Sequence, residues 1–371
     1  MKYDFDEIVP RRGTNAIKWD MDTDPEVLPM WVADMDFRTA PAVAAALQRR
    51  VQHDIFGYAT APKAYYDAIT GWFRRRHGWQ IRPEWVLHTT GVIPALSAVI
   101  KALTQPGDKV LIQTPVYNHF FTSIHNTYTI DFDDLERKAA DPAVKLMLLC
   151  NPHNPAGRVW TPAELHRIGE LCLRHDVVVV ADEIHCELVM PGFRYTPFAS
   201  LCEEFERRSV TCTSPSKAFN LAGLQVANIF AADAALRARI GHSLQINETG
   251  EIGPFAIEAL IAAYDEGAEW LDALNEYLHG NYRFSREYFD RNLPQYPVLP
   301  LEGTYLVWVD CRASGLTSDE LETKLLEEAK LRINPGAIYG EAGRDFIRLN
   351  IACPRKLLAE GLDRLRKVLK R

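Results

Sequence analysis

The sequence predicts an α/β fold, with a large domain built on a mostly parallel sheet and a smaller α+β domain. Short apolar runs alternate with helical patterns over about 150 residues of the chain, as in layered α/β proteins. Some of these runs, such as Val177 to Val180, are continuously apolar, which is typical of strands buried on both faces of a parallel sheet. At 371 residues the chain also exceeds the usual size of one hydrophobic core, so we expect two domains.

Two helices are predicted before the alternating region. Residues 1–40 are irregular in pattern and contain the apolar stretch VLPMWVADMDF. Residues 41–53 begin with a proline, which is favoured in the first turn of a helix. Residues 62–78 carry a second helical pattern, which ends at Gly78.

The alternating region supplies the predicted sheet. Its strands are expected at 85–91, 108–115, 144–152, 177–183, 209–216 and 226–233, and its helices at 92–103 and 161–176. Long helical patterns then dominate from residue 255 to residue 293. They precede strand patterns at 303–310, 331–336 and 345–352, a helix at 318–330 and a basic amphipathic terminal helix. We therefore expect a large domain at 41–265 and a small domain formed by 1–40 and 266–371.

The composition is that of an ordinary globular protein, with 47% hydrophobic and 25% charged residues. A net charge of −7 argues against nucleic acid or a membrane surface as a general partner. The sequence shows neither a secretory signal nor a run of the roughly 18–20 apolar residues that cross a bilayer. The seven cysteines are odd in number and lack C-x-x-C spacing, so we expect no disulfide framework, no metal site and a cytoplasmic location.

Polar residues gather where the predicted strands end. They are Thr89-Thr90-Gly91, Pro115-Val116-Tyr117, Asn151 to Gly157, Asp182 to His185 and Ser214 to Lys217. Ligands of open parallel sheets bind beyond the carboxyl ends of the strands, where these segments converge. A crevice lined by all five segments is therefore the candidate site.

Each segment has two interpretations. Lys217 is either a solvated surface charge or an amine held in a pocket for chemistry. Asp182 follows four valines, so it is either a cap or a buried carboxylate paired with a cation such as a protonated ring nitrogen. Asn154, in NPHNPAG, belongs either to a rigid turn or to a preorganised amide donor. Residues 89–96 are a glycine-containing turn into a helix, a common arrangement whose free N–H groups can bind phosphate.

Together these residues match what pyridoxal 5'-phosphate (PLP) requires. A lysine supplies the Schiff-base amine, a carboxylate keeps the pyridine nitrogen protonated, and a helix start binds the phosphate. Tyr117 either stacks on the ring or packs in the core. Arg348, in the apolar run DFIRLNIA, either grips a substrate carboxylate or points to water from an edge strand. The nucleotide motifs G-x-x-x-x-G-K-[ST] and G-x-G-x-x-G are absent from the sequence, and the acidic and histidine residues of ADEIHCE lack metal-ligand spacing.

The order N-P-x-N-P-x-G, D-E-I-H, S-x-S-K and a late arginine in an apolar strand resembles the fold-type I, aspartate-aminotransferase-like family of PLP enzymes. The resemblance covers nearly the whole chain. More narrowly, PMWVADMDF, FGYATAP, TPVYNHF, NPHNPAGRVW, ADEIHCEL and SPSKAFNLAGLQ resemble the MalY/PatB type of cystathionine β-lyase, or cysteine-S-conjugate β-lyase. This resemblance implies the fold-type I architecture and PLP as the cofactor.

The resemblance also implies roles for individual residues. Lys217 matches the catalytic lysine that forms the Schiff base, and Arg348 matches the clamp for the substrate α-carboxylate. Tyr58 matches a tyrosine donated to the phosphate by the neighbouring subunit, which implies a homodimer with shared active sites. The other implied cofactor contacts are Asp182 at the ring nitrogen, Asn154 at the ring 3′-oxygen with His185 nearby, Tyr117 on the ring face, the Val92 and Ile93 amides at the phosphate, and Ser214 and Ser216 beside it. Tyr117 and Asn154 are also expected to border the substrate.

Two departures from the family pattern stand out. Many aminotransferases have a phosphate-binding arginine eight residues after the lysine, whereas this chain has Gln225, as the β-lyase type does. The stretch SIHNTYTIDFDDLE is also shorter than in relatives, which have a further strand and turn there. Because this stretch borders the expected site, predictions for the substrate entrance do not extend to it.

The leading interpretation is a PLP-dependent carbon–sulfur β-lyase that converts L-cystathionine or a related cysteine S-conjugate to a thiol, pyruvate and ammonia. The alternative is a PLP-dependent aminotransferase acting on an amino acid and a 2-oxo acid, since the same lysine can return the proton to the cofactor. Some relatives of this type also bind a transcription activator, but nothing in the sequence marks such a surface. A cofactor-free Schiff-base aldolase would explain Lys217 and leave Asp182 and the phosphate-binding turn without a purpose.

Overall fold

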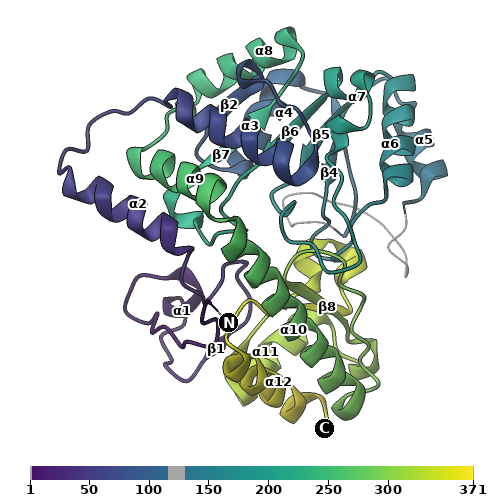
Figure 1. Ribbon diagram of the computed structural model, residues 1–371. Helices are drawn as coiled ribbons and strands as arrows, with labels where there is room; N and C mark the ends of the chain where they lie inside the picture. Colours follow the sequence, from purple (N-terminus) through teal and green to yellow (C-terminus); the bar gives the residue numbers. More distant parts are fainter. Residues whose placement is uncertain (1, 116–129, 371) are drawn as a thin grey trace.

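The computed structural model describes residues 2–115 and 130–370 and consists of a large sheet-based part and a smaller part beside it (Figure 1). None of the helices in these ranges is long and apolar enough to cross a membrane. Tyr117 and the first half of the short stretch at 123–136 lie outside the described residues.

The large part contains a six-stranded sheet in the order β2-β7-β6-β5-β4-β3. Its strands are β2 (Val86–Thr89), β3 (Lys109–Ile112), β4 (Val144–Cys150), β5 (Val178–Asp182), β6 (Ser209–Thr213) and β7 (Ala227–Phe230). Only β7 is antiparallel to its neighbours, so the other five strands end at one edge and β7 begins there. The predicted mostly parallel sheet is confirmed.

Helices cover both faces of this sheet. On one face α4 (Val92–Leu103) and α8 (Ala234–Ile246) pack against Leu146 and Val178, among others. On the other face α5 (Phe132–Ala139), α6 (Pro162–Arg174) and α7 (Glu203–Arg207) pack against Met147 and Val179. Neighbouring residues of one strand thus bury opposite faces, because successive strand side chains alternate. This explains why the strand sequences are continuously apolar.

The helices predicted near the N-terminus are present. They are α2 (Pro41–Gln52) and α3 (Lys63–His77), and Gly78 ends α3 in the left-handed conformation at φ 69°. Such a residue satisfies the last carbonyls of a helix, and glycine adopts this conformation without strain. The short α1 (Ile17–Asp20), α5 and α8 were not predicted, and α7 was also missed.

The small part combines residues from both ends of the chain. Helix α9 (Pro254–Glu266) is followed at Gly267 by α10 (Ala268–Asn292), so the long helical pattern is two helices. The C-terminal elements are β8 (Leu306–Asp310), α11 (Ser318–Ala329), β9 (Leu331–Arg332), β10 (Asn334–Pro335), β11 (Phe346–Asn350) and α12 (Arg355–Leu369). Strands β10, β11 and β8 form an antiparallel sheet, and β1 (Leu28–Pro29) pairs with β9. The expected α+β character is confirmed, and the N-terminal residues join this part. Short 3-10 helices occur at 83–85, 198–200, 222–224, 312–314, 336–339 and 341–343.

The largest core cluster continues from one part into the other. It includes Trp72 of α3, Leu260 of α9 and Leu274 of α10, together with Leu358 of α12. Continuous packing of this kind holds the small part firmly against the large one. The domain boundaries at residues 41 and 265 stay a prediction.

Candidate active site

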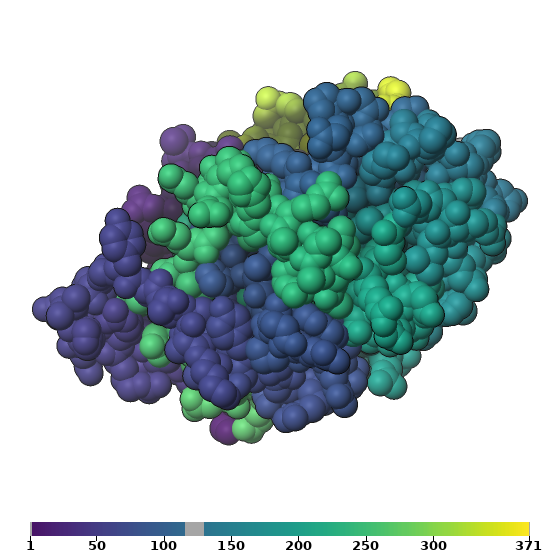
Figure 2. All heavy atoms as spheres, turned by 90° about the horizontal axis from the view of Figure 1, so that it is seen from above, coloured from purple at the N-terminus to yellow at the C-terminus, as the bar shows by residue number. Residues whose placement is uncertain are grey.

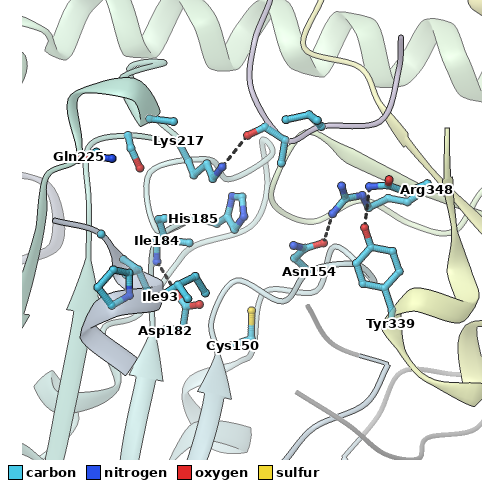
Figure 3. Close-up of a pocket in the computed structure, with 18 of the residues that line it drawn as sticks. Ile93, Cys150, Asn154, Asp182, Ile184, His185, Lys217, Gln225, Tyr339 and Arg348 are labelled. Carbon is cyan, nitrogen blue, oxygen red and sulfur yellow. Dashed lines mark hydrogen bonds between the residues drawn. The ribbon is translucent and has the colours of Figure 1, made fainter. Parts of the chain in front are cut away.

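A cavity of about 400 Å³ lies where the strands of the large sheet end, between this edge and the small part (Figure 3). It brings together most of the residues expected to form the site. Those on its wall are Val92, Ile93, Asn154, Asp182, His185, Ser216, Lys217 and Arg348. The crevice predicted from the strand ends is therefore present among the described residues.

Lys217 follows β6 and extends its amine into this cavity. Its Nζ donates a hydrogen bond to the carbonyl of Ala33 at 2.7 Å. Burial lowers the pKa of Lys217 to about 8, and the positive charge of Arg348 also lowers it, whereas Asp34 and Asp182 raise it. The interpretation as a solvated surface lysine is wrong, and the amine is closer to neutrality than an exposed lysine would be.

Asp182 ends β5 at the bottom of the same cavity, opposite Cys150 of β4 (Figure 3). Its Oδ1 accepts a hydrogen bond from the Ile184 amide at 3.2 Å. Burial raises the pKa of Asp182 to about 6, although the Ile184 amide and Lys217 oppose the rise. Among the described residues no cation forms an ion pair with this carboxylate, so it is available to a cationic ligand group.

Helix α4 begins at the cavity and provides donors for an anion. Gly91 precedes the helix, and the first helical hydrogen bond runs from the Ala95 amide to the Gly91 carbonyl at 3.0 Å. The amides of Val92 and Ile93 therefore have no partner within the helix. Thr90 and Ser216 also line this part of the cavity. Free amides at a helix start and neighbouring hydroxyls suit a phosphate group.

Arg348 and Asn154 meet on the opposite side of the cavity. Arg348 lies in β11 and is only 2% exposed, so the interpretation as a solvent-facing arginine is wrong. Its Nη1 donates to Asn154 Oδ1 at 3.0 Å and its Nη2 to the Trp31 carbonyl at 2.9 Å. The buried Nε has no hydrogen-bond partner among the described residues. A buried guanidinium with a free donor can bind a carboxylate.

His185 lies between Lys217 and Asn154 in the cavity (Figure 3). Burial lowers the pKa of His185 to about 3, and the charges of Lys217 and Arg348 add to this effect. The ring is therefore neutral at physiological pH. Its buried Nδ1 lacks a hydrogen-bond partner within the described ranges, so it remains free for a ligand.

Three expected residues are not on the described cavity wall. Ser214 lies behind Ser216, because its hydroxyl donates to the Val226 carbonyl at 2.6 Å and accepts from the Ser216 amide at 3.0 Å. This places Ser214 as a support of the loop rather than a direct contact of the cavity. Tyr58 is fully exposed and lies away from the cavity of its own chain. Tyr117 lies outside the described residues, so its expected contacts stay a prediction.

Several residues on the cavity wall were missed by the sequence reasoning. Ala33 contributes a backbone carbonyl, which no side-chain pattern indicates. Tyr339 lies under the Arg348 guanidinium, with 5.0 Å between the guanidinium carbon and the ring centroid. Asn334 donates to the Tyr339 hydroxyl at 3.0 Å. A polar asparagine within a strand pattern was the available signal for Asn334, and none existed for Ala33.

The donors and acceptors of this cavity fit PLP. The unpaired carboxylate of Asp182 suits a protonated ring nitrogen, and the α4 start suits the phosphate. Lys217 offers a buried amine whose lowered pKa increases the neutral share. The neutral amine is the form that bonds to a carbonyl carbon. Gln225 lines the cavity in place of a phosphate-binding arginine, so the phosphate would be held mainly by neutral donors.

A second group of potential ligand atoms lies elsewhere in the fold. His77, Cys186 and Glu187 have ligand atoms within 4.8 Å of one another. Glu187 Oε1 is already in hydrogen bonds with Trp72 Nε1 at 2.7 Å and with His77 Nε2 at 2.6 Å. These contacts account for the cluster as a buried hydrogen-bond network.

Comparisons with known proteins give a consistent result. The family model described as "Aminotransferase class I and II" matches residues 25–365. Cystathionine beta-lyase PatB of Bacillus subtilis (strain 168) is 43% identical, over 98% of this chain and 99% of that protein. Protein MalY of Escherichia coli (strain K12) is 35% identical, over 97% of each. The crystal structure of cystalysin from Treponema denticola, which contains a pyridoxal 5'-phosphate cofactor, matches with a TM-score of 0.96 and 34% identity, over 100% of this chain and 99% of that chain.

Proposed function

The chain belongs to the aminotransferase class I and II family, and we propose that it is a PLP-dependent carbon–sulfur β-lyase. It converts L-cystathionine or a related cysteine S-conjugate to a thiol, pyruvate and ammonia. The observation that carries this proposal is one buried cavity that joins the Lys217 amine, the Asp182 carboxylate, a free helix start and the Arg348 guanidinium. These are the groups that hold the cofactor and an amino acid substrate at one place.

PLP, when bound, withdraws electrons from the substrate Cα and so stabilises negative charge there. The protein residues provide the binding and the proton transfers. Asp182 keeps a positive charge on the ring nitrogen, since a carboxylate in a buried site favours a protonated partner. The Val92 and Ile93 amides hold the phosphate, while Arg348 holds the substrate carboxylate and fixes Cα near Lys217.

Lys217 is the proton carrier. Because burial lowers its pKa to about 8, a larger share of the amine is neutral at physiological pH than for an exposed lysine, and the neutral amine can accept the proton from Cα. The neutral His185 beside it does not add a positive charge that would repel the resulting ammonium. The electron pair left at Cα then forms the Cα–Cβ double bond as the Cβ–S bond breaks, and the departing thiolate takes up a proton. Water hydrolyses the remaining enamine to pyruvate and ammonia.

The β-lyase activity is preferred to the aminotransferase alternative on the basis of the relatives. PatB, which matches over 98% of this chain, carries the name cystathionine beta-lyase. Gln225 in place of the family's arginine is in accord with this choice. An aminotransferase would use the same cavity, and the assay below separates the two reactions.

The assembly and location belong to the proposal as well. The protein forms a homodimer in which Tyr58 of one subunit reaches the phosphate of the other, and it works in the cytoplasm. The fully exposed position of Tyr58 supports this arrangement, since a tyrosine outside its own site can serve a neighbouring one. No nucleic acid or membrane partner is proposed.

The function is tested by incubating the purified protein with PLP and L-cystathionine, without a 2-oxo acid. We expect pyruvate and a thiol to form. Amino-group transfer that requires an added 2-oxo acid would instead identify an aminotransferase.

Lys217→Ala should abolish nearly all turnover, because both the bond to the cofactor and the proton carrier are lost. Borohydride reduction followed by mass spectrometry should place the cofactor on Lys217, and an adduct on another lysine would refute the assignment.

A further inference from the structure

The segment of residues 31–37, here called the strap, passes along the cavity and is held by its backbone carbonyls. Arg348 and Asn334 donate to the Trp31 carbonyl at 2.9 and 3.0 Å. Further along the strap, Asn220 donates to the carbonyls of Met35 and Phe37, each at 3.0 Å. The strap is thus fastened to the small part at one end and to the loop after Lys217 at the other.

Asn350 of β11 holds the middle of the strap by two backbone carbonyls. Asn350 Nδ2 donates to the carbonyls of Val32 and Asp34, each at 2.6 Å. Asn350 is 1% exposed, and its Oδ1 accepts from the Ala352 amide at 2.7 Å, so its orientation is fixed. The two carbonyls on either side of Ala33 are therefore directed to β11.

The carbonyl of Ala33, between those of Val32 and Asp34, faces the opposite way, into the cavity. It accepts from Lys217 Nζ at 2.7 Å, the contact drawn as a dashed line from Lys217 in Figure 3, and from the Tyr305 hydroxyl at 3.0 Å. Tyr305 is fully buried, and its hydroxyl and the Lys217 amine share this oxygen. A buried carbonyl that accepts from an amine stabilises its protonated form.

We propose that Asn350 is a positioning residue of the reaction, which aims the Ala33 carbonyl at the place where Lys217 holds its proton. The inference rests on the proposed function, because only a lysine that leaves the cofactor and carries a proton needs such an acceptor. Asn350 touches neither the cofactor site nor Lys217, and it acts through the strap. Arg348, two residues earlier in β11, lies on the same face of the strand, so the substrate clamp and this support share one element.

The test measures the titration of Lys217 in the full chain without PLP. Reductive methylation over a pH series, with mass spectrometry of the Lys217 peptide, reports the pKa of this amine directly. The charged groups that face it are Asp34 of the strap, Asp182 of β5 and Arg348 of β11, and they are unchanged in the variants. Asn350→Ala should lower the pKa of Lys217 by about one unit, because the ammonium loses a well-directed acceptor.

The matched control is Asn281→Ala. Asn281 is fully buried and donates to the carbonyls of Ile351 and Cys353 at 2.8 and 2.9 Å, the same kind of support one segment further along. Both variants should lose a similar amount of thermal stability, since each removes an amide group that donates to two backbone carbonyls. Only Asn350→Ala should shift the Lys217 titration. An equal shift in Asn281→Ala, or no shift in folded Asn350→Ala, would overturn the inference.

With PLP and substrate, Asn350→Ala should lower kcat by about tenfold, because an amine of lower pKa is a weaker base and takes the Cα proton more slowly. KM should change little, since Arg348 stays in place. Tyr305→Phe provides a second variant in case Asn350→Ala does not fold. It removes the second donor from the Ala33 carbonyl and leaves this oxygen to the Lys217 ammonium alone, so the pKa of Lys217 should rise. A fall or no change would contradict the proposal. The titration needs no turnover, whereas pyruvate release by the parent protein tests the proposed function. Failure of the role proposed for Asn350 is therefore distinguishable from failure of the proposed function.

Discussion

Asp182 is a buried carboxylate that destabilises the cofactor-free protein electrostatically. It is fully enclosed at the end of β5, and burial raises its pKa from 3.8 to about 6. Well below pH 4 the carboxyl is protonated in both folded and unfolded chains and does not affect stability. As the pH rises to 6 the unfolded chain releases this proton first, so the carboxyl progressively destabilises the fold, and above pH 6 the penalty is constant.

Asp182→Asn should therefore stabilise the cofactor-free protein at neutral pH. Two pKa units correspond to about 2–3 kcal/mol in the free energy of unfolding, and the difference should shrink as the pH falls below 6 and vanish well below pH 4. Urea unfolding of both proteins across this pH range measures the difference.

Asp182→Asn with PLP should turn over far more slowly, because an uncharged ring nitrogen is a poor electron acceptor. Near-normal kcat would mean that Asp182 is only a structural cap.

At the scale of elements, the start of α4 is the feature that would bind the cofactor phosphate. The Val92 amide stands at the first helical position, where it has no partner within the helix. Proline is favoured at this position, and extended Gly91 before it is compatible with a following proline. A proline here removes a donor without breaking the helix.

Val92→Pro should thus weaken PLP binding with little loss of helix stability. One hydrogen bond to a charged group contributes about 1.5–3 kcal/mol, which corresponds to roughly tenfold or more in the Kd for PLP. Equilibrium titration with PLP, followed by absorbance, measures this change. Val92→Ala is the control, since it trims the side chain and keeps the amide. If both variants bind PLP equally well, the amide does not contact the phosphate.

At the scale of the whole molecule, the connection between α2 and α3 projects from the body of the chain (Figure 2). It carries the exposed side chains of Ile55, Phe56 and Tyr58, and Val51 near the end of α2 is also exposed. An apolar group of this kind on a projecting segment is typical of a surface that another subunit covers. This placement agrees with a tyrosine that serves a neighbouring active site.

The shared site predicts complementation between two defective variants. Lys217→Ala lacks the amine, and Tyr58→Ala lacks the residue supplied to the neighbour. A mixed dimer contains one site with both residues intact, so mixing the two variants should restore part of the activity. Pyruvate release from mixed dimers of verified composition measures this. Mixed dimers without recovered activity would place Tyr58 in its own subunit's site or outside both.

Tyr58→Phe alone should weaken PLP retention only modestly, by about 1.5–3 kcal/mol.

The sequence by itself determined the layered α/β fold and most of the strand-end residues of the cavity. Both signals are local, because a continuously apolar run reports burial on two faces and a polar residue directly after it marks the strand end. Lys217, Asp182 and the α4 start were identified in this way, and the helices α5 and α8 lacked such a clear pattern. Only the tertiary structure decided that Ser214 supports the loop behind the wall, that Lys217 and Tyr305 share the Ala33 carbonyl, and that Asn350 holds the two carbonyls beside it. Lys217 lies 184 positions from Ala33 and Tyr305 lies 272 away, and the shared acceptor is a backbone carbonyl. Since every residue has such a carbonyl, its direction depends on the folded path of the chain, and no residue type indicates it.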